Sequence, residues 1–288
     1  MFKHICLSIS ALCMLAFAAC TNKEADTVSL NYATFNIRYD NPEDSLNNWK
    51  YRKDSVAAFI TAHNLDIVGC QEVLYHQLTD LQERLPDYGY VGVCRDDGDR
   101  AGEAAPIFYK KDRFEVLANS TFWLSQYPDS VGFIGWDGAC CRIATWAKLR
   151  ERKSGRIFMA VNTHFDHVGT EARRKAALLI IDSIRSIVGE EPAILTGDFN
   201  VNDESEAYKT ITTNEFVLND AFKTAEEREG VTWTFHDWGK IPEDECEKID
   251  FIFVTSGISV KKALIPHPGT GPTGYLSDHN PHIAQLEF

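Results

Sequence analysis

Hydrophobic residues along this chain recur in short runs, and most of these runs end in polar residues. Eight runs are rich in β-branched and aromatic side chains and are bounded by residues that favour turns, which is typical of strands. The predicted strands cover residues 28–36, 66–73, 106–110, 144–150, 156–165, 193–200, 248–254 and 282–288.

Two segments between these strands have the spacing of amphipathic helices. In residues 52–64, one face would carry Val56, Phe59, Ile60 and His63. Residues 170–188 carry a stripe of alanine, leucine and isoleucine, with Thr170 as the expected N-cap. Because strands and helices alternate along the chain, the sequence predicts an α/β or α+β fold in which sheets are buried beneath helices.

The start of the chain predicts export. A short basic segment is followed by an apolar stretch, residues 5–19, that is too short to span a membrane comfortably. The stretch ends in small residues before Cys20 and resembles a bacterial lipoprotein signal, although Phe17 is unusual at its position and leaves ordinary signal cleavage as an alternative. We expect a cleaved signal peptide at 1–19, a tether at 20–27 that begins with a lipidated cysteine, and one domain at 28–288.

The composition fits a folded domain with an acidic surface. Hydrophobic residues make up 44% of the 288 residues, which is enough for a sizeable core. The formal net charge is −13, and it becomes −14 once residues 1–19, which contain Lys3 and no acidic residue, are removed. Because long polyanions are normally bound by basic surfaces, this charge disfavours general DNA binding and favours a small phosphorylated substrate or a metal ion.

Cysteine and histidine spacing argues against disulfides and zinc. Five cysteines remain after processing, an odd number without a CxxC pair, so a disulfide framework is disfavoured. A single bridge stays open in an oxidising compartment, and the sequence does not identify its partners. His164 and His167 lie three residues apart but lack a cysteine or a third histidine at ligand spacing, which disfavours zinc.

Five of the predicted strands lead into polar residues that can carry chemistry. These residues are Asn36, Glu72, Asn162 and His164, Asp198 and Asn200, and, after a connecting loop, Asp278 and His279. Because functional sites are built on loops at strand ends of a rigid sheet, we expect these side chains to lie close together. Asp250 differs from them, since it stands near the start of an apolar strand.

The residue types at these strand ends suit phosphate chemistry. A carboxylate such as Glu72 is a good ligand for a hard cation, since Mg²⁺ typically takes one or two carboxylates together with waters and substrate oxygens. Asp198 could orient or deprotonate a water or bind metal, and the Asn200 amide could hold a phosphoryl oxygen. Each residue also has a purely structural interpretation: a helix-entry glutamate for Glu72 and an Asx turn for Asp198.

Asp250 and His279 form the most informative long-range pair. A buried aspartate could bind one ring nitrogen of the histidine, fix its tautomer and raise its basicity. That is the orienting logic of a catalytic dyad in which water takes the place of a serine. Taken alone, Asp278-His279-Asn280 would be interpreted more simply as a polar turn before the last strand.

Two further segments could bind the rest of a substrate. Arg95 belongs to a polar loop before the strand at 106–110, and Trp136 and Arg142 precede the strand at 144–150. An aromatic ring beside an arginine suits a ring platform next to a phosphate, although tryptophan more often packs in a core. No P-loop, GxSxG or GxGxxG motif is present, which excludes the common triphosphatase and serine-hydrolase sites.

Six segments in chain order together resemble the endonuclease/exonuclease/phosphatase family, the superfamily of the pancreatic-type DNases. The segments are "FNIRYD", "QEV", "NTHFDH", "GDFN", "IDFIF" and "SDHNP". Two loops, "RDDG…GE…PIFY" and "FWLS…GWD…TWA", are most similar to the deadenylase-related branch and its bacterial relatives. The resemblance implies an α/β fold, built as a four-layered α/β/β/α sandwich with two packed mixed β-sheets, and a phosphoesterase that depends on Mg²⁺ or Mn²⁺.

The resemblance also implies roles for individual residues. The expected catalytic residues are His279, Asp250, Asp198, Asn200 and His164. The expected metal-binding residues are Glu72, Asn36 and Asp278, and the expected substrate-binding residues are Arg95, Trp136, Arg142 and Asn162. Arg38 stands where some family members carry an acidic residue, so a second metal contact from the first segment is not expected.

The reaction implied is hydrolysis of a phosphodiester or phosphomonoester by in-line attack of an activated water. The deadenylase-like segments favour a nucleotide or oligonucleotide as substrate, and a phospholipid or inositol phosphate head group is the alternative. A lipid-anchored binding protein that has lost catalysis is a further alternative. Through lipidated Cys20, a monomeric enzyme would be held in the bacterial cell envelope, in the periplasm or at the outer-membrane surface.

Overall fold

The computed structural model describes residues 27–189, 191–214, 216, 218–269 and 274–288. The expected signal peptide, Cys20 and the tether up to residue 26 lie outside these residues. Within the described part of the chain, no helix is long and apolar enough to cross a membrane.

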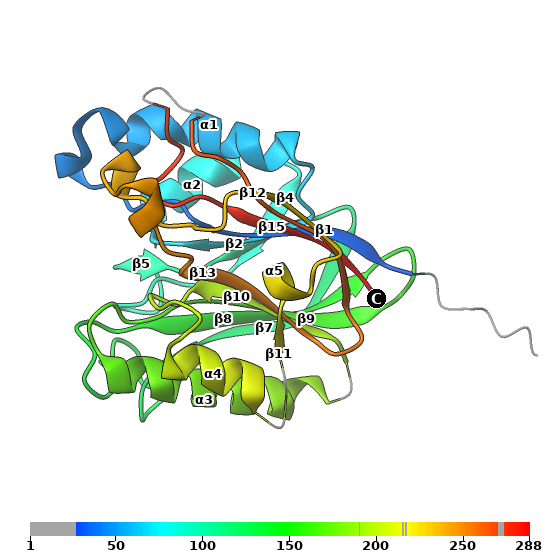
Figure 1. Ribbon diagram of the computed structural model, residues 1–288. Coiled ribbons are helices and arrows are strands. Elements are labelled where there is room, and N and C mark those ends of the chain that lie inside the picture. The colour runs from blue at the N-terminus through cyan, green and yellow to red at the C-terminus, as the bar shows by residue number, and fades with distance from the viewer. Residues whose placement is uncertain (1–26, 190, 215, 217, 270–273) are drawn as a thin grey trace, which may run out of the picture.

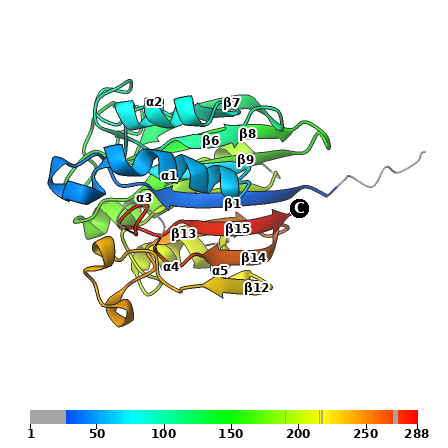
Figure 2. The same ribbon diagram turned by 90° about the horizontal axis from the view of Figure 1, so that it is seen from above.

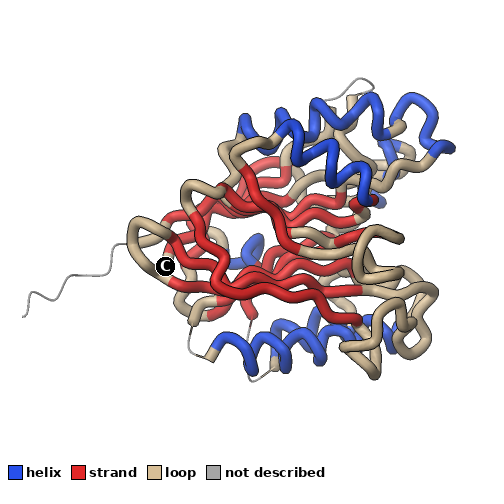
Figure 3. Tube along the Cα trace, turned by 180° about the vertical axis from the view of Figure 1, so that it is seen from behind, coloured by secondary structure: helices blue, strands red, loops and turns tan. Residues whose placement is uncertain are grey.

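Two large mixed sheets lie face to face, and helices cover the outer face of each (Figure 1 and Figure 3). The first sheet consists, in spatial order, of β12 (Glu227–Gly230), β14 (Ser259–Ile265), β15 (His282–Glu287), β1 (Ser29–Asn36), β2 (Ile67–Gln71), β6 (Ile107–Lys110) and β4 (Tyr88–Val91). The second consists of β11 (Leu218–Asp220), β13 (Asp250–Thr255), β10 (Ala193–Asp198), β9 (Ile157–His164), β8 (Ile143–Glu151) and β7 (Phe114–Trp123). A short separate ribbon pairs β3 (Val73–Leu74) with β5 (Glu103–Ala104).

The longer helices divide between the two outer faces. α1 (Trp49–Ala62) and α2 (Tyr75–Arg84) cover the first sheet, as Figure 2 shows from above, and α3 (Thr170–Val188) and α4 (Glu206–Thr213) cover the second. The remaining helical turns are α5 (Ala221–Thr224), η1 (Pro42–Asn47), η2 (Asp237–Gly239) and η3 (Glu243–Glu245). This order of layers confirms the four-layered α/β/β/α sandwich that the family resemblance implies.

The period of two along each strand distributes side chains between the core layers. In β1, Leu30 and Tyr32 point between the two sheets, whereas Ala33 and Phe35 point toward α1 and α2. The strands β9, β10 and β13 of the second sheet alternate in the same way. The result is one apolar cluster between the sheets and one under each pair of helices, and the burial of these clusters is the main force that holds the layers together.

All eight predicted strands are present, with ends that differ by at most two residues. The prediction missed all four edge strands, β12, β4, β11 and β7, and also β14 and the short β3 and β5. β12 and β7 carry exposed polar residues, and β4 and β11 are only four and three residues long, so none of these four edge strands forms a long apolar run. The expected cap of α3 was wrong, since Thr170 is already inside the helix. Asp137 of the β7–β8 loop instead accepts hydrogen bonds from the N–H groups of Glu171 (3.2 Å) and Ala172 (2.6 Å), and no local pattern predicts a cap from a distant loop.

Candidate active site

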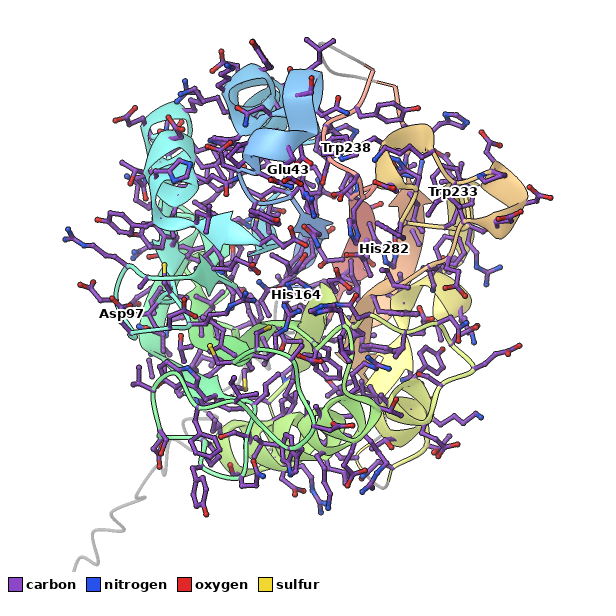
Figure 4. All side chains as sticks on the ribbon, turned by 90° about the vertical axis from the view of Figure 1, so that its left-hand side faces the viewer. Glu43, Asp97, His164, Trp233, Trp238 and His282 are labelled. Carbon is purple, nitrogen blue, oxygen red and sulfur yellow. The ribbon has the colours of Figure 1, made fainter. Side chains whose placement is uncertain are left out.

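The polar strand ends meet at one edge of the layer between the two sheets. Asn36 ends β1, His164 ends β9 and Asp198 ends β10, and each continues the inner-facing row of its strand. Asp250 starts β13, but β13 runs antiparallel to β10 and places Asp250 opposite Asp198. Figure 4 looks onto this edge of the molecule, with His164 near the centre of the view.

Asn36 links the two sheets at this edge. Its Nδ2 donates to Glu72 Oε1 at 3.0 Å and to Asp198 Oδ2 at 2.9 Å, and it lies 3.4 Å from His279 Nε2. Its Oδ1 accepts from the N–H of Arg38 at 3.0 Å. Because Asn36 is fully buried, its amide fixes carboxylates of both sheets relative to one another.

Three residues just beyond the strand ends have left-handed backbone conformations. Glu72 has φ +60°, Asn200 has φ +50° and Arg38 has φ +59°, values that are uncommon for residues with side chains. Strain of this kind persists where the surroundings fix it and is concentrated at functional sites. Burial alone would raise the pKa of Glu72, but the hydrogen bond from Asn36 and the positive charges of His279 and Arg38 lower it.

His279 is buried and paired with Asp250. Its Nδ1 lies 2.9 Å from Asp250 Oδ2, and its ring packs on Phe235 with the ring centroids 4.9 Å apart. The other ring nitrogen, Nε2, therefore faces Asp198, whose Oδ2 is 3.8 Å away. Burial opposes the charged ring, yet the charge of Asp250 and its hydrogen bond raise the pKa of His279 to about 10. The structure thus brings together the pair that the sequence analysis linked.

Asp198 lies between the two histidines of the edge. Its Oδ2 is 3.6 Å from His164 Nε2, and its Oδ1 accepts from the N–H of Asn200 at 2.9 Å. Burial, together with the negative charge of Asp250, raises the pKa of Asp198 to about 7. A carboxyl group with such a pKa exchanges protons near neutral pH, which suits general acid–base chemistry.

His164 is held as a neutral ring. Burial and the charges of Arg142 and Arg95 hold the pKa of His164 well below its usual range. Asn200 Nδ2 lies 3.0 Å from His164 Nε2, so the amide donates and the ring proton resides on Nδ1. That Nδ1 has no hydrogen-bond partner and lies 3.8 Å from Glu103 Oε2.

The residues at this edge line a cavity of about 540 Å³. Its charged and polar lining residues include Arg38, Glu72, Glu103, Arg142, His164, His167, Asp198, Asn200, Asp278 and His279. The volume lies within the range of small-molecule sites. Because carboxylates, arginines and histidines face the same space, the cavity can hold an anionic group together with a cation.

The carboxylates of the edge suit a hard divalent cation. Glu72, His164 and Asp198 each offer a ligand atom, and these atoms lie within 4.8 Å of one another. Buried carboxylates that approach so closely repel one another unless a cation compensates them. Carboxylate oxygens are also the ligands that Mg²⁺ and Mn²⁺ prefer. Glu72 and Asp198, with the Asn36 amide between them, therefore fit such an ion.

Asn162, which the sequence analysis expected to bind substrate, lies inside the fold instead. It is fully buried, and its Nδ2 donates to the carbonyls of Cys70 (2.7 Å) and Pro106 (3.0 Å). Its Oδ1 accepts from Gln71 Nε2 at 2.6 Å, so the side chain ties β9 to the first sheet. The prediction was wrong because two residues along a strand move a side chain about 7 Å from the edge.

Of the other three expected substrate-binding residues, only Arg142 lines the cavity. It is buried, and its Nη2 lies 3.0 Å from His167 Nδ1. Arg95 forms an ion pair with Glu103 through two hydrogen bonds of 2.8 and 2.9 Å and reaches the cavity only through that carboxylate. Trp136 packs against the apolar cluster beneath the second sheet, so the expected ring platform is not formed by this residue.

A cysteine lies close to His167 in the structure, although the sequence spacing indicated no cysteine partner for a zinc site. Cys140, Asp166 and His167 have ligand atoms within 4.8 Å of one another, a proximity that sequence spacing does not reveal. However, Asp166 already accepts hydrogen bonds from three backbone N–H groups at 2.7 to 2.9 Å, which explains it as a residue that stabilises its loop. All five cysteines of the described residues are free, so the single bridge left open by the sequence is not formed.

The sequence also did not predict several residues that line the cavity, among them Glu103 and Phe235. Glu103 lines the cavity, but a carboxylate shortly before a strand is too common to serve as a signal. Phe235 supports the ring of His279 and pairs with its backbone in an isolated bridge. Its contact with His279 joins segments that are remote in the sequence, so no local pattern indicates it.

Comparisons with known proteins agree with this geometry. The model of the endonuclease/exonuclease/phosphatase family matches residues 33–279. The structure of an endonuclease/exonuclease/phosphatase from Bacteroides vulgatus is 62% identical, has a TM-score of 0.89 and covers 91% of this chain and 99% of its own. A mannosyl-6-phosphatase from Bacteroides thetaiotaomicron is 34% identical, with a TM-score of 0.84 over 90% of this chain and 100% of its own. Nocturnin from Drosophila melanogaster is 25% identical over 86% of this chain, and the match spans 43% of nocturnin's length.

Proposed function

We propose, on the premise that this chain belongs to the endonuclease/exonuclease/phosphatase family and is a phosphoric ester hydrolase, that it hydrolyses the phosphomonoester of a small molecule such as a sugar phosphate. One observation carries the proposal: a single buried cluster couples a site for a divalent cation to a histidine–aspartate dyad. The family generally depends on divalent metals, and we propose Mg²⁺ or Mn²⁺ for this chain because the available ligands are carboxylates.

In the proposed reaction, a water attacks phosphorus in line with the leaving oxygen. Asp198 and His279 orient this water, since Asp198 Oδ2 and His279 Nε2 face the same point of the cavity, 3.8 Å apart. Asp198, whose pKa is raised to about 7, takes its proton. Asp250 holds His279 Nδ1 and so keeps Nε2 directed at the reacting centre.

In the transition state, negative charge develops on the phosphoryl oxygens. A nearby cation and hydrogen-bond donors stabilise this charge. A divalent ion held by Glu72 and Asp198 would polarise a phosphoryl oxygen and offset that charge. Asn200 Nδ2 lines the cavity and donates to the carbonyl of Phe165 and to the ring of His164 at 3.0 Å each. By exchanging its bond to the ring, it would donate to a second phosphoryl oxygen. Glu72, Asp198 and Asn200 are positioned by the fold before substrate binds, which lowers the cost of reorganisation in the transition state.

Three observations support a small phosphomonoester over a nucleic acid. The cavity of about 540 Å³ suits a small molecule, and the net charge of −13 disfavours a long polyanion. The mannosyl-6-phosphatase is more similar to this chain, at 34% identity, than Drosophila nocturnin is, at 25%. The proposal therefore reverses the order suggested by the deadenylase-like segments, which favoured nucleotides.

A nucleotide substrate is the second candidate function. The match to nocturnin over 86% of the chain favours it. Arg142 favours it as well, because this buried cation on the cavity wall has two nitrogens, Nε and Nη1, without a hydrogen-bond partner in the structure. Such a cation would attract a further anionic group of a larger substrate.

The expected lipid anchor at Cys20 affects whether a lipid head group is a plausible substrate. The eight residues of β1 separate Ser29 from Asn36 by about 23 Å, and the site lies at the Asn36 end (Figure 1). A chain anchored through Cys20, ahead of Ser29, would hold the cavity on the side away from its own membrane. Lipidation, an envelope location and a monomeric state stay predictions. If the chain is lipidated, this geometry favours a soluble substrate over a lipid head group.

A substrate panel tests the proposal. Purified protein is assayed with mannose 6-phosphate, p-nitrophenyl phosphate, bis-(p-nitrophenyl) phosphate, a single-stranded oligonucleotide and sphingomyelin, each with Mn²⁺ or with EDTA. The proposal expects phosphomonoester hydrolysis that requires Mn²⁺ and exceeds the rate on every diester. Faster cleavage of the oligonucleotide would favour the second candidate, and turnover of sphingomyelin alone would contradict both.

A further inference from the structure

Arg38 lies between two carboxylates of the site. Its Nη1 is 3.8 Å from Glu72 Oε2, and its Nε is 3.6 Å from Asp278 Oδ2. The same guanidinium donates to Asp44 through Nε at 3.0 Å and through Nη2 at 3.3 Å. Because Arg38 lines the cavity, a fixed positive charge lies directly beside the proposed cation site.

The position of Arg38 is built into the fold. Its backbone is in the left-handed region, and its N–H donates to Asn36 Oδ1. Its carbonyl accepts from Nη2 of the buried Arg52 at 3.3 Å, and Nη1 of Arg52 donates to the carbonyls of Ile37 and Leu276 at 2.7 Å each. Arg52 therefore holds the segment around Arg38 against the segment that leads to Asp278.

Three carboxylates share the guanidinium of Arg38. Glu72, Asp278 and Asp44 all lie within 4.0 Å of the one guanidinium. Asp278 belongs to neither of the ligand groups that contain Glu72 or Asp198, because its Oδ2 faces Arg38 and its Oδ1 accepts from Ser277 Oγ at 3.1 Å. The space between Glu72 and Asp278, where two acids could bind a cation, is thus occupied by a cation of the protein.

We propose that Arg38 takes the place of a second divalent cation between Glu72 and Asp278, so that the site holds one divalent ion. This inference rests on the proposed cation site at Glu72 and Asp198. The sequence alone indicated only that the first family segment, "FNIRYD", lacks an acidic ligand at Arg38. Without the guanidinium, the buried Asp278 and the half-buried Glu72 would leave a space lined by carboxylate oxygens, the ligands that Mn²⁺ and Mg²⁺ prefer.

Calorimetric titration of the metal-free protein with Mn²⁺ tests the inference without measuring activity. The wild type should bind one equivalent, and Glu72→Gln should lose it, which places the counted ion at this site. Arg38→Ala should bind a second equivalent. Arg38→Lys keeps a positive charge and should bind one, as should Arg84→Ala, which removes a surface arginine from α2 and changes the net charge by the same amount.

The possible results separate the two proposals. If the wild type binds no Mn²⁺, the proposed function and the inference fail together. If the wild type binds two equivalents, or if Arg38→Ala binds one with unchanged affinity, the inference alone fails. Arg38→Gln, which keeps most of the side-chain volume, replaces Arg38→Ala in the test if circular dichroism shows that the alanine variant is unfolded.

A competing role for Arg38 is direct binding of substrate phosphate, and the same variants distinguish it. Inorganic phosphate is titrated into the Mn²⁺-loaded wild type and the Arg38→Ala variant. A tenfold or greater loss of phosphate affinity, with the Mn²⁺ stoichiometry still at one, would make Arg38 a substrate ligand and overturn the inference. A second Mn²⁺ equivalent in the variant supports the inference.

Discussion

Two polar regions lie next to each other between the sheets, and they have opposite characters. The edge region consists of Asn36, Glu72, Asp198, Asp250 and His279. The interior region, one step deeper along the same strands, consists of Thr34, Gln71, Asn162 and Thr196. Both regions are buried and both bridge the two sheets, so burial and polarity alone do not distinguish a catalytic site from structural support.

The difference between the regions lies in charge and access. The interior groups are neutral and bond mainly to one another and to backbone carbonyls. They are packed so tightly that a Cβ on Gly69 would lie 2.5 Å from Asn162 Oδ1, which explains the glycine there. Glu72, Asp198 and His279 at the edge are ionisable, have shifted pKa values and line a cavity. Ionisable groups with shifted pKa values next to an opening are what indicate function in this fold.

Two histidines in the same part of the chain repeat the contrast. His279 at the edge has its pKa raised to about 10, because the partner Asp250 outweighs the effect of burial. His282, which begins β15, is also fully buried, but neither of its ring nitrogens has a hydrogen-bond partner in the structure. Burial therefore lowers the pKa of His282 to about 3. The same residue type is an acid–base group in one region and a neutral packing group in the other.

The largest expected effect is on catalysis at the edge. His279→Ala should lower kcat for p-nitrophenyl phosphate by about 10³-fold, the usual size of a lost general acid–base group. It should also lower the melting temperature, because it leaves the buried Asp250 without its partner. His282→Leu is the matched control and should keep the wild-type kcat. Mn²⁺-dependent hydrolysis and circular dichroism melts measure the two quantities. Equal losses of activity in both variants would erase the distinction between the regions.

The second largest expected effect distinguishes two asparagines, one that supports the stability of the fold and one that supports catalysis. Asn162→Ala should lower the free energy of unfolding by about 2–4 kcal/mol, because it removes three buried hydrogen bonds, to the carbonyls of Cys70 and Pro106 and from the amide of Gln71. Its folded fraction should keep kcat. Asn36→Ala should instead lower kcat, because it releases Glu72 and Asp198. Urea unfolding and steady-state kinetics on both variants test this, and the reverse assignment of effects would contradict it.

The smallest expected effect is a pH dependence of stability from His282. The folded-state pKa of about 3 lies below the ordinary value of 6.5, so the contribution is fully present above pH 6.5 and is lost as the pH falls toward 3. The wild type should therefore lose about 2 kcal/mol more than His282→Leu between pH 7 and pH 5. Urea unfolding at the two pH values measures the difference. Parallel losses in both proteins would show that His282 is not held neutral.

The sequence predicts the inner strands better than the edges of the sheets. Strands such as β1, β9 and β10 are buried on both faces and therefore carry continuous apolar runs that stand out in the sequence. β7 has an exposed central part and reads as a loop. Asn36, His164 and Asp198 were predictable for the same reason, since each lies at the end of a buried strand, where a polar residue interrupts an apolar run.

The sequence could not predict depth or long-range pairing. Asn162 and His164 share one face of β9, and only the position of the sheet edge decides which of them reaches the cavity. The ion pair of Arg95 with Glu103 and the placement of Arg38 between Glu72 and Asp278 depend on how loops fold back onto the sheets. Residue type indicated that Arg95 could bind an anion but not that the protein itself supplies that anion.

The central claim is that the edge region forms a metal-dependent centre for phosphomonoester hydrolysis. The most direct measurement is the rate of mannose 6-phosphate hydrolysis as Mn²⁺ is returned to EDTA-treated protein, for the wild type and for Glu72→Gln. We predict a wild-type rate that rises from background to a plateau, and a rate for Glu72→Gln that stays near background over the same range. A wild-type rate that EDTA does not change, or an equal plateau for Glu72→Gln, would contradict the account.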